Sequence, residues 1–232
     1  MKNYLFELCA ESVEAIAAGE RGGADRAELC ARLDVGGVTP EASLTAAAVA
    51  AVSIPVFVLI RPRAGDFVYS GAEFSQMRRQ IEEAKQAGAG GVVLGVLRDD
   101  GSIDVERSRE LVEWARPMAV TFHRAFDRTP DLSAALEAVI ATGADFLLTS
   151  GGAADVLGGA EALAPLVRQA GERIRIMAGG GLRLGNLVEI LERSGVHCLH
   201  GSLTQHGSEA GTLETNVGEA VGLMEGIFCC RS

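Results

Sequence analysis

The chain has 232 residues, 48% of them hydrophobic and 22% charged, which excludes a disordered protein and suits one large domain or two small ones. With 31 acidic and 21 basic residues the formal charge is −10, which argues against nucleic acid or an anionic membrane surface as partner. Met1–Ala10 is interrupted by Glu7, and the longest apolar run elsewhere is Ala46–Val52. We therefore expect neither a signal peptide nor a membrane span.

Short apolar or β-branched runs alternate with segments of helical period along almost the whole chain. The predicted strands are Tyr4–Cys9, Asp25–Cys30, Pro55–Arg61, Gly91–Leu97, Met118–His123, Asp145–Ser150, Ile174–Ala178 and His197–Gly201. The predicted helices are Ser12–Glu20, Pro40–Val52, Glu73–Ala87, Val105–Ala115, Leu132–Thr142, Ala154–Ala170 and Leu187–Arg193. Glycines end several of these helices just before a strand, where a left-handed residue is favoured.

This alternation predicts an α/β fold, a single-domain (β/α)8 TIM barrel, because right-handed parallel crossovers with covered faces favour closure at eight strands. An open doubly wound sheet would place Gly-x-Gly-x-x-Gly after the first strand, and Cys9–Ser12 does not match it. We assign residues 1–202 to the barrel. The pattern weakens over 203–232, where Thr212–Phe228 fits either a packed final helix of the same domain or a loose tail.

Polar residues cluster at the predicted C-terminal ends of the strands, where TIM barrels build their sites. Alternation along the strands places these side chains on inward faces: Glu7, Cys9, Arg26, Glu28, Cys30, Arg61, Arg63, His123, His200 and Ser202. Buried charges must pair or bind a ligand, because desolvation of a lone charge is costly. Glu7 and Glu28 therefore either form an internal salt-bridge ring with Arg26 and Arg61, or one of them acts beside His123 as a general base.

Arg61-Pro62-Arg63 predicts two guanidiniums on one side of an extended segment, because proline holds the residue before it in an extended region. Such a pair suits a carboxylate or phosphate. The alternative pairs one arginine with Glu7 or Glu28 and leaves the other at the surface.

His123 ends a predicted strand, and Asp127 follows four residues later in Thr121-Phe122-His123-Arg124-Ala125-Phe126-Asp127. We expect Asp127 to fix the His123 tautomer if the loop turns back, which would make both catalytic residues. The alternative is a structural histidine. Of the other histidines, we expect His197 in packing or at the surface, and His206 in the weakly patterned tail.

Glycine-rich segments follow the last predicted strands. Gly180 and Gly181 follow the seventh strand, and His200 and Ser202 lie at the end of the eighth. TIM barrels commonly bind phosphate there through backbone amides and a helix start, so these four residues are candidates for anion binding. The alternative is a bare turn, as it is for Ser150-Gly151-Gly152.

The five cysteines are odd in number and contain no Cys-x-x-Cys pair, which suggests reduced thiols. Cys9 and Cys30 end neighbouring predicted strands, each two residues after a glutamate, so both sulfurs could reach one soft ion such as Cu(I). The alternative is two small buried residues. We expect any chelation by the vicinal Cys229 and Cys230 to be incidental.

Several of these segments together resemble the CutC family, copper homeostasis proteins with a TIM-barrel fold. The matching segments are Glu7-Leu8-Cys9, Gly23–Arg26 with Glu28-Leu29-Cys30, Gly36–Pro40, Ile60–Arg63 with Gly65–Phe67 and Tyr69-Ser70, Thr121–Asp127, and Leu148–Gly151. The resemblance covers about residues 4–202 and implies a cytoplasmic, often oligomeric protein that binds Cu(I) through Cys9 and Cys30. After His200 the sequence departs from the family's usual ending.

The residues and the resemblance support two hypotheses. The first is a cytoplasmic copper homeostasis protein that binds Cu(I) at the barrel mouth, as a homo-dimer or homo-tetramer. The second is a metal-independent lyase, isomerase or hydrolase acting on a small phosphorylated or carboxylated compound. Arg61, Arg63 and the glycine loops would then hold the anion, while His123 and Glu28 exchange protons.

Overall fold

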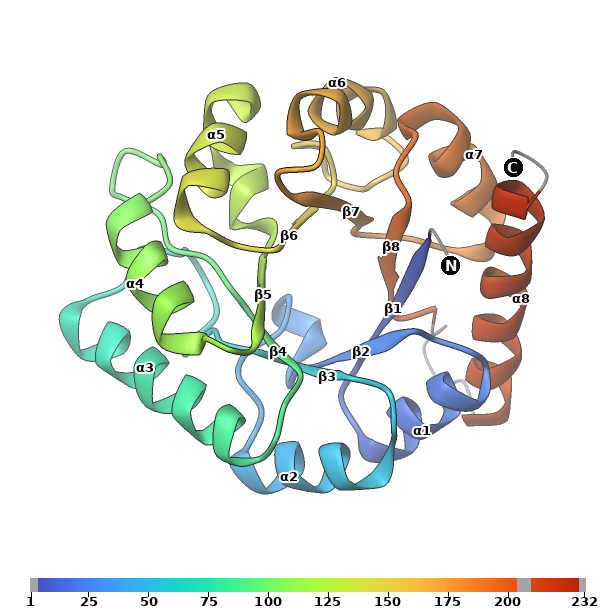
Figure 1. The fold of residues 1–232 in the computed structure, drawn as a ribbon, viewed down its shortest axis with the longest axis horizontal. Coiled ribbons are helices and arrows are strands. Elements are labelled where there is room, and N and C mark those ends of the chain that lie inside the picture. Colours follow the sequence, from blue (N-terminus) through green and yellow to red (C-terminus); the bar gives the residue numbers. More distant parts are fainter. Residues whose placement is uncertain (1–3, 204–209, 230–232) are drawn as a thin grey trace.

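The computed structural model describes residues 4–203 and 210–229. Eight parallel strands form a closed barrel in chain order, so that the first strand pairs with both the second and the eighth, and helices surround the barrel (Figure 1). The predicted single-domain TIM barrel is thus confirmed.

The strands and helices of the described residues alternate throughout. The strands are β1 (Leu5–Ala10), β2 (Arg26–Leu29), β3 (Val56–Leu59), β4 (Gly91–Leu94), β5 (Ala119–Phe122), β6 (Phe146–Thr149), β7 (Arg175–Gly179) and β8 (Cys198–Gly201). The helices are α1 (Val13–Arg21), α2 (Ala42–Ala51), α3 (Gly71–Gln86), α4 (Val105–Ala115), α5 (Leu132–Thr142), α6 (Ala160–Ala170), α7 (Leu184–Ser194) and α8 (Ala210–Cys229).

Helix boundaries differ most from the prediction around α6 and α7. The predicted helix from Ala154 begins only at Ala160, because the Val156 N–H donates to the Gly180 carbonyl at 2.7 Å and holds this segment as a loop. Helix α7 begins three residues before the predicted Leu187, where the Asn186 side chain accepts from the Arg183 N–H at 2.8 Å. Both differences come from contacts that local periodicity does not contain.

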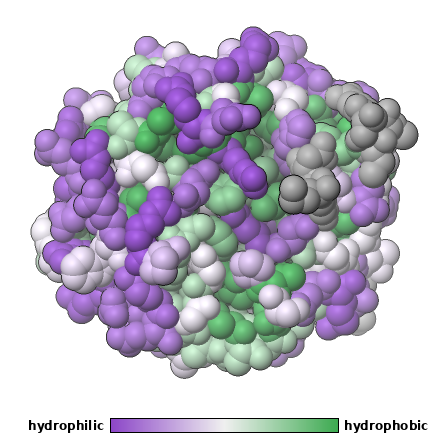
Figure 2. Space-filling model, viewed as in Figure 1, coloured by the Kyte–Doolittle hydropathy of each residue, from purple (hydrophilic) through white to green (hydrophobic). Residues whose placement is uncertain are grey.

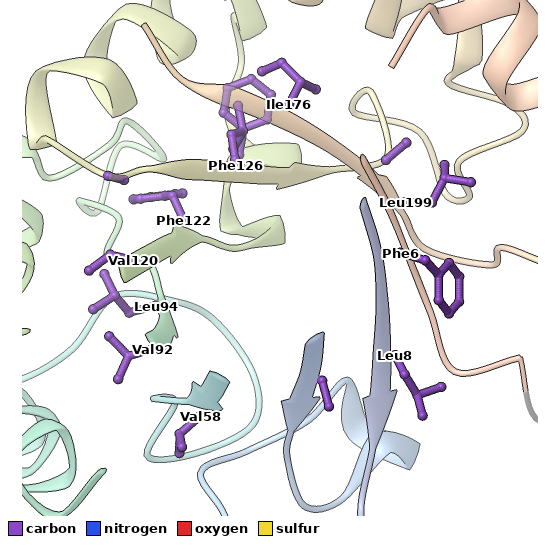
Figure 3. Packing of buried hydrophobic residues seen from close by; sticks show 14 of the residues in the cluster. Phe6, Leu8, Val58, Val92, Leu94, Val120, Phe122, Phe126, Ile176 and Leu199 are labelled. Atoms are coloured by element: carbon purple, nitrogen blue, oxygen red, sulfur yellow. The ribbon is translucent and has the colours of Figure 1, made fainter. Parts of the chain in front are cut away.

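The strands of the barrel separate an outer apolar layer, which faces the helices, from the residues packed inside the barrel. Outward-facing residues such as Phe6, Leu8 and Phe122 belong to the large apolar layer between strands and helices (Figure 3). The barrel interior holds two smaller apolar clusters, one with Cys9, Cys30, Phe57, Leu59 and Val93, the other with Leu148, Met177 and Cys198. Polar side chains such as Glu7 and Arg26 are also buried inside the barrel.

Helix α8 decides between the two alternatives left open for the C-terminal segment. It packs against α1 as part of the outer layer (Figure 1). The Arg21 guanidinium pairs with Glu214 at 2.7 Å, and the Tyr4 ring stacks on Phe228 with centroids 5.5 Å apart. The segment is therefore a packed helix, not a loose tail.

On the face seen in Figure 2, hydrophilic residues dominate the rim, and a hydrophobic area lies over α2 at the bottom of the view. The exposed residues of α2 are mainly alanines: Ala42, Ser43, Ala46, Ala47, Ala50 and Ala51. None of the helices within residues 4–203 and 210–229 is both long and apolar enough to cross a membrane.

Candidate functional site

The ends of strands β1, β2 and β8 bring together six of the residues predicted to face inward: Glu7, Cys9, Arg26, Glu28, Cys30 and His200. Their register aligns Glu7 with Arg26 and with His200, and Cys9 with Glu28. All six residues are buried, with at most 9% of the surface of each residue exposed. The inward faces predicted from strand alternation therefore meet inside the barrel.

Glu7 is the centre of a buried ionic network. Its Oε2 accepts from Arg26 Nε at 2.5 Å, and its Oε1 lies 2.7 Å from His200 Nδ1. Burial acts to raise the pKa of Glu7, but the Arg26 charge and the His200 hydrogen bond outweigh it and hold that pKa below its ordinary value. Burial lowers the pKa of His200, but the Glu28 charge and the hydrogen bond and charge of Glu7 outweigh it, so that pKa lies above its ordinary value.

Arg26 is fixed in the barrel interior by aromatic rings. Its guanidinium lies 4.0 Å from the ring centroids of both Phe57 and Phe146, and its Nη2 donates to Thr121 Oγ1 at 3.3 Å. Cation–π contacts of this kind are strongest when the cation is desolvated. The alternative of an internal salt-bridge ring is thus realised for Glu7 with Arg26, but Arg61 takes no part in it.

The second group joins the two thiols to Glu28. Cys9 Sγ lies 3.7 Å from Cys30 Sγ and donates to Glu28 Oε1 at 3.6 Å. One ligand atom from each of the three residues lies within 4.8 Å of the other two. The strand alignment predicted this approach of the sulfurs, which makes the group a candidate metal centre.

Burial dominates the electrostatics of this group. It raises the pKa of Glu28 to about 7, with the Glu7 charge adding to the effect and His200 opposing it. Glu28 Oε2 is buried and has no hydrogen-bond partner among the described residues. The pKa of Cys9 lies well above its ordinary value because of the hydrogen bond with Cys30 and burial, so this thiol is protonated at neutral pH.

Arg61 lies beyond β3 and holds loops through backbone carbonyls. Its Nη1 donates to the Val35 and Gly37 carbonyls at 3.1 and 2.7 Å, and its Nη2 to Gly65 at 2.9 Å. Its Nε is buried and has no partner among the described residues. The buried Nε–H is therefore left for a ligand.

Arg63, by contrast, makes its hydrogen bonds with the loop that follows it and with the start of α3. Its guanidinium pairs with Glu73 at 2.5 Å and with Asp66 at 2.8 Å, and it donates to the Val68 carbonyl at 2.7 Å. All three of its nitrogens have partners, and the side chain is 37% exposed. Neither arginine pairs with Glu7 or Glu28, and only Arg61 keeps an unpartnered donor.

Asp127 does not fix the tautomer of His123, contrary to the expectation. Its carboxylate accepts from Thr149 Oγ1 at 2.5 Å, from Arg124 Nε at 2.8 Å and from the Ser150 N–H at 3.0 Å. It thereby ties the turn Arg124–Arg128 to the segment after β6. The carboxylate is satisfied there because several donors of that segment point to it.

His123 is oriented by the backbone. Its Nδ1 accepts from the Ala125 N–H at 3.2 Å, while its buried Nε2 has no partner among the described residues. Burial and the Arg61 charge lower the pKa of His123 to about 3, so the ring is neutral and its proton sits on Nε2. The Nε2–H group of His123 faces no acceptor among the described residues.

A cavity of about 510 Å³ opens beside the β1–β2–β8 residues. Cys9, His200 and Ser202 line it, as do Gly180 and Gly181 at the end of β7. Both glycines have positive φ, +103° and +77°, which favours glycine. Gly180 has a further constraint, since a Cβ there would lie 2.7 Å from Arg124 Nη1.

Arg124 was not predicted as a site residue from the sequence. It bridges Asp127 and Ser150 Oγ and lies against Gly180, at the edge of the mouth. The only signal in the sequence is its place directly after His123. Of the remaining residues, the His197 ring packs against the Phe228 ring, tilted by 40° with centroids 4.7 Å apart, while His206, Cys230 and the side chain of Cys229 lie outside the described residues.

Comparison with known proteins places this geometry in a family. The model of the CutC family matches residues 4–205. The chain belongs to the CutC family. It is 47% identical over 198 residues to the human copper homeostasis protein cutC homolog, covering 84% of this chain and 72% of that protein. A CutC family protein of Caulobacter vibrioides is 46% identical over 198 residues, covering 85% and 80% respectively.

Comparison with solved structures supports the same family. A CutC structure from Streptococcus agalactiae matches with a TM-score of 0.81 and 32% identity, covering 87% of this chain and all of that one. A thiamine phosphate pyrophosphorylase from Pyrococcus furiosus matches with a TM-score of 0.66 at 16% identity, which reflects the barrel fold alone. Relatives in this family carry the name copper homeostasis protein, and in this chain the buried thiol pair of Cys9 and Cys30 lies at the end of β1 and β2.

Proposed function

We propose that this member of the CutC family binds Cu(I) through Cys9 and Cys30 in a reducing, cytoplasmic environment. The observation that carries the proposal is the distance of 3.7 Å between the two sulfurs, with a Glu28 oxygen within 4.8 Å of both. Thiolates are the ligands that select Cu(I) over harder ions. The copper ion is the cargo here, not a resident cofactor.

The surroundings of the thiols support this ion. Phe57, Leu59 and Val93 enclose the sulfurs on the barrel side, and Cys30 is fully buried. Two sulfurs in an apolar pocket are soft ligands with few oxygen atoms around them, which suits Cu(I) better than a hydrated divalent ion. Cys9 lines the 510 Å³ cavity, which supplies a path for the ion.

The test is an anaerobic Cu(I) competition titration with all thiols reduced. We expect tight, equimolar binding by the wild type and at least a hundredfold loss of affinity in Cys9→Ser and in Cys30→Ser. Cys198→Ser is the matched control, because Cys198 is also buried in the barrel but belongs to the other interior cluster. Unchanged affinity in both site variants would refute the proposal.

A second control addresses the C-terminal cysteines. The variant that carries both Cys229→Ser and Cys230→Ser should keep the wild-type affinity. Loss of binding only in this variant would move the copper to the end of the chain. The homo-oligomer that the family resemblance implies stays a prediction, and sedimentation of the same variants measures it.

A second candidate function rests on a different observation. Arg61 Nε and His123 Nε2 are buried N–H donors without partners among the described residues, and both side chains pack on Phe67, at 4.9 and 4.8 Å. Two unsatisfied donors suit an oxygen of a small carboxylated or phosphorylated compound. In such an enzyme the neutral His123 donates a hydrogen bond, and Glu28 is the residue suited to proton transfer.

Inorganic phosphate and acetate are the simplest probes of this candidate. Calorimetric titration should show binding to the wild type that weakens at least tenfold in His123→Phe, which keeps a ring against Phe67 but removes the donor. Equal binding by both proteins, or none by either, would count against the enzyme.

A further inference from the structure

Cys9 and Cys30 lie close enough to react with each other as well as with an ion. Of the three cysteines whose side chains the structure describes, these two lie at the ends of neighbouring strands, β1 and β2 (Figure 1). Their sulfurs are 3.7 Å apart, whereas Cys198 belongs to the other interior cluster. The sulfurs of a disulfide lie about 2.0 Å apart. The two thiols therefore need only a short approach to form one.

The backbone on the β2 side has to follow its sulfur in this approach. The register aligns Cys9 with Glu28, so Cys30 lies two residues further along the paired strands. Cys30 comes directly after Leu29, the last residue of β2. The bond therefore forms when the segment after Leu29 shifts toward β1, and the strain of that shift makes the disulfide easy to reduce.

A shift of Cys30 acts on the loop that follows β2. This loop packs on Cys30, since a Cβ at Gly37 would lie 3.5 Å from Cys30 Cβ, and Leu33 packs against the same apolar cluster. Leu33 and Cys9 both line the 510 Å³ cavity. Oxidation of the pair therefore changes the wall of the cavity together with the sulfurs.

The two thiols differ in their access to an oxidant. Cys9 lines the cavity and is 5% exposed, whereas Cys30 is fully buried. A small oxidant such as hydrogen peroxide therefore meets Cys9 first. The hydrogen bond with Cys30 and burial raise the pKa of Cys9, so its attack is slower than that of an exposed thiolate. Such a pair responds to sustained rather than brief oxidation.

We propose that Cys9 and Cys30 are a redox-active pair that peroxide converts reversibly into a disulfide, which switches off the Cu(I) site. The Cys9 sulfur attacks one peroxide oxygen and the O–O bond breaks. Cys9 becomes a sulfenic acid, and its thiol proton leaves with the other oxygen as water. The Cys30 sulfur then attacks the Cys9 sulfur, the S–O bond breaks, and the Cys30 proton leaves with that oxygen as a second water. The two sulfurs together lose two electrons, and the peroxide takes both.

The disulfide and Cu(I) exclude each other, because both use the same two sulfurs. This consequence rests on the proposed function, whereas the formation of the disulfide does not. Oxidation releases the ion, and by linkage bound Cu(I) protects the pair from oxidation.

The test is a hydrogen peroxide titration of the copper-free protein, followed by alkylation of the remaining thiols and tryptic digestion without reductant. Cys9 and Cys30 fall in different tryptic peptides, residues 3–21 and 27–32, and the other cysteines all lie in residues 194–231. We expect the first two peptides joined, lighter by two hydrogen atoms, and separated again by glutathione. Two alkylated peptides, or Cys9 oxidised to a sulfinic acid without a cross-link, would overturn the redox pair.

Single variants test the order of the two steps. In Cys30→Ser the reaction should stop at the Cys9 sulfenic acid, which dimedone labels. In Cys9→Ser the fully buried Cys30 should stay reduced under the same conditions. Cys198→Ser is the matched control and should form the cross-link as the wild type does. Equal dimedone labelling of both site variants would overturn the assignment of Cys9 as the thiol attacked first.

A Cu(I) titration of the oxidised protein separates this proposal from the copper proposal. We expect its affinity to fall to that of Cys9→Ser and to return after reduction, and an unchanged affinity in the cross-linked protein would overturn the switch. A cross-link in a protein that does not bind Cu(I) would refute the copper site and support the redox pair. Cu(I) binding without any cross-link would do the opposite. Circular dichroism of each variant confirms that the barrel is folded.

Discussion

The two sides of the barrel mouth carry similar residues but use them differently. On the side of β1, β2 and β8, carboxylates, thiols and a histidine face one another inside the barrel, and Glu28 Oε2 is left without a partner among the described residues. On the other side, formed by β3, β5 and β6, the charged residues make most of their hydrogen bonds with neighbouring loops. These residues are Arg61, Arg63 and Asp127. The hydrogen-bond partners of a polar residue at the barrel mouth therefore indicate its role better than its residue type does.

The largest expected effect comes from breaking the buried pair on the first side. Arg26→Met should cost about 3–5 kcal/mol of unfolding free energy, because it leaves Glu7 charged and buried with only His200 beside it. Urea unfolding followed by circular dichroism measures the loss. The double variant Arg26→Met with Glu7→Gln should recover much of it, and a loss below about 1 kcal/mol would show that the pair is not desolvated as described.

Asp127→Asn tests whether the second side is structural. The variant should lose about 1–3 kcal/mol, because an amide cannot accept all the hydrogen bonds from Thr149, Arg124 and Ser150. The Cu(I) affinity should stay at the wild-type value. A drop in Cu(I) affinity without a loss of stability would mean that Asp127 belongs to the ion site after all.

His123 predicts a pH dependence of stability. Its folded-state pKa of about 3 lies below the ordinary value of 6.5, so the unfolded chain binds the proton more readily. The contribution of His123 is therefore fully present above pH 6.5 and is lost as the pH falls toward 3, at up to about 1.4 kcal/mol per pH unit.

The comparison of wild type with His123→Gln isolates this effect, since the other titrating groups are common to both. Unfolding free energies measured between pH 7.5 and pH 4.5 should converge as the pH falls. Parallel profiles would show that His123 is accessible to water and titrates normally.

Arg63→Gln should have the smallest effect, about 1 kcal/mol or less. Its ion pairs with Asp66 and Glu73 are partly solvated, with 37% of the arginine side chain exposed. The same unfolding measurement, made beside Arg26→Met, compares an exposed arginine–carboxylate pair with a buried one. Equal losses in both variants would contradict the distinction between the two sides.

Features that depend on period and strand order could be predicted from the sequence. The eight units, the inward faces of Glu7, Cys9, Glu28 and Cys30, and the approach of the two sulfurs are all consequences of alternation along parallel strands. Helices α4 and α5 coincide with their predicted bounds because their apolar period and caps agree.

The features that the sequence did not determine lie in the loops. Asp127 accepts hydrogen bonds from Thr149 and Ser150 instead of contacting His123. Arg61 donates to the backbone carbonyls of residues 35, 37 and 65. These partners are distant in sequence and are brought near only when the barrel closes. The repeating pattern of apolar residues determines where strands and helices lie, because it recurs along the whole length of each element. The hydrogen-bond partner of a single loop residue depends on the whole fold.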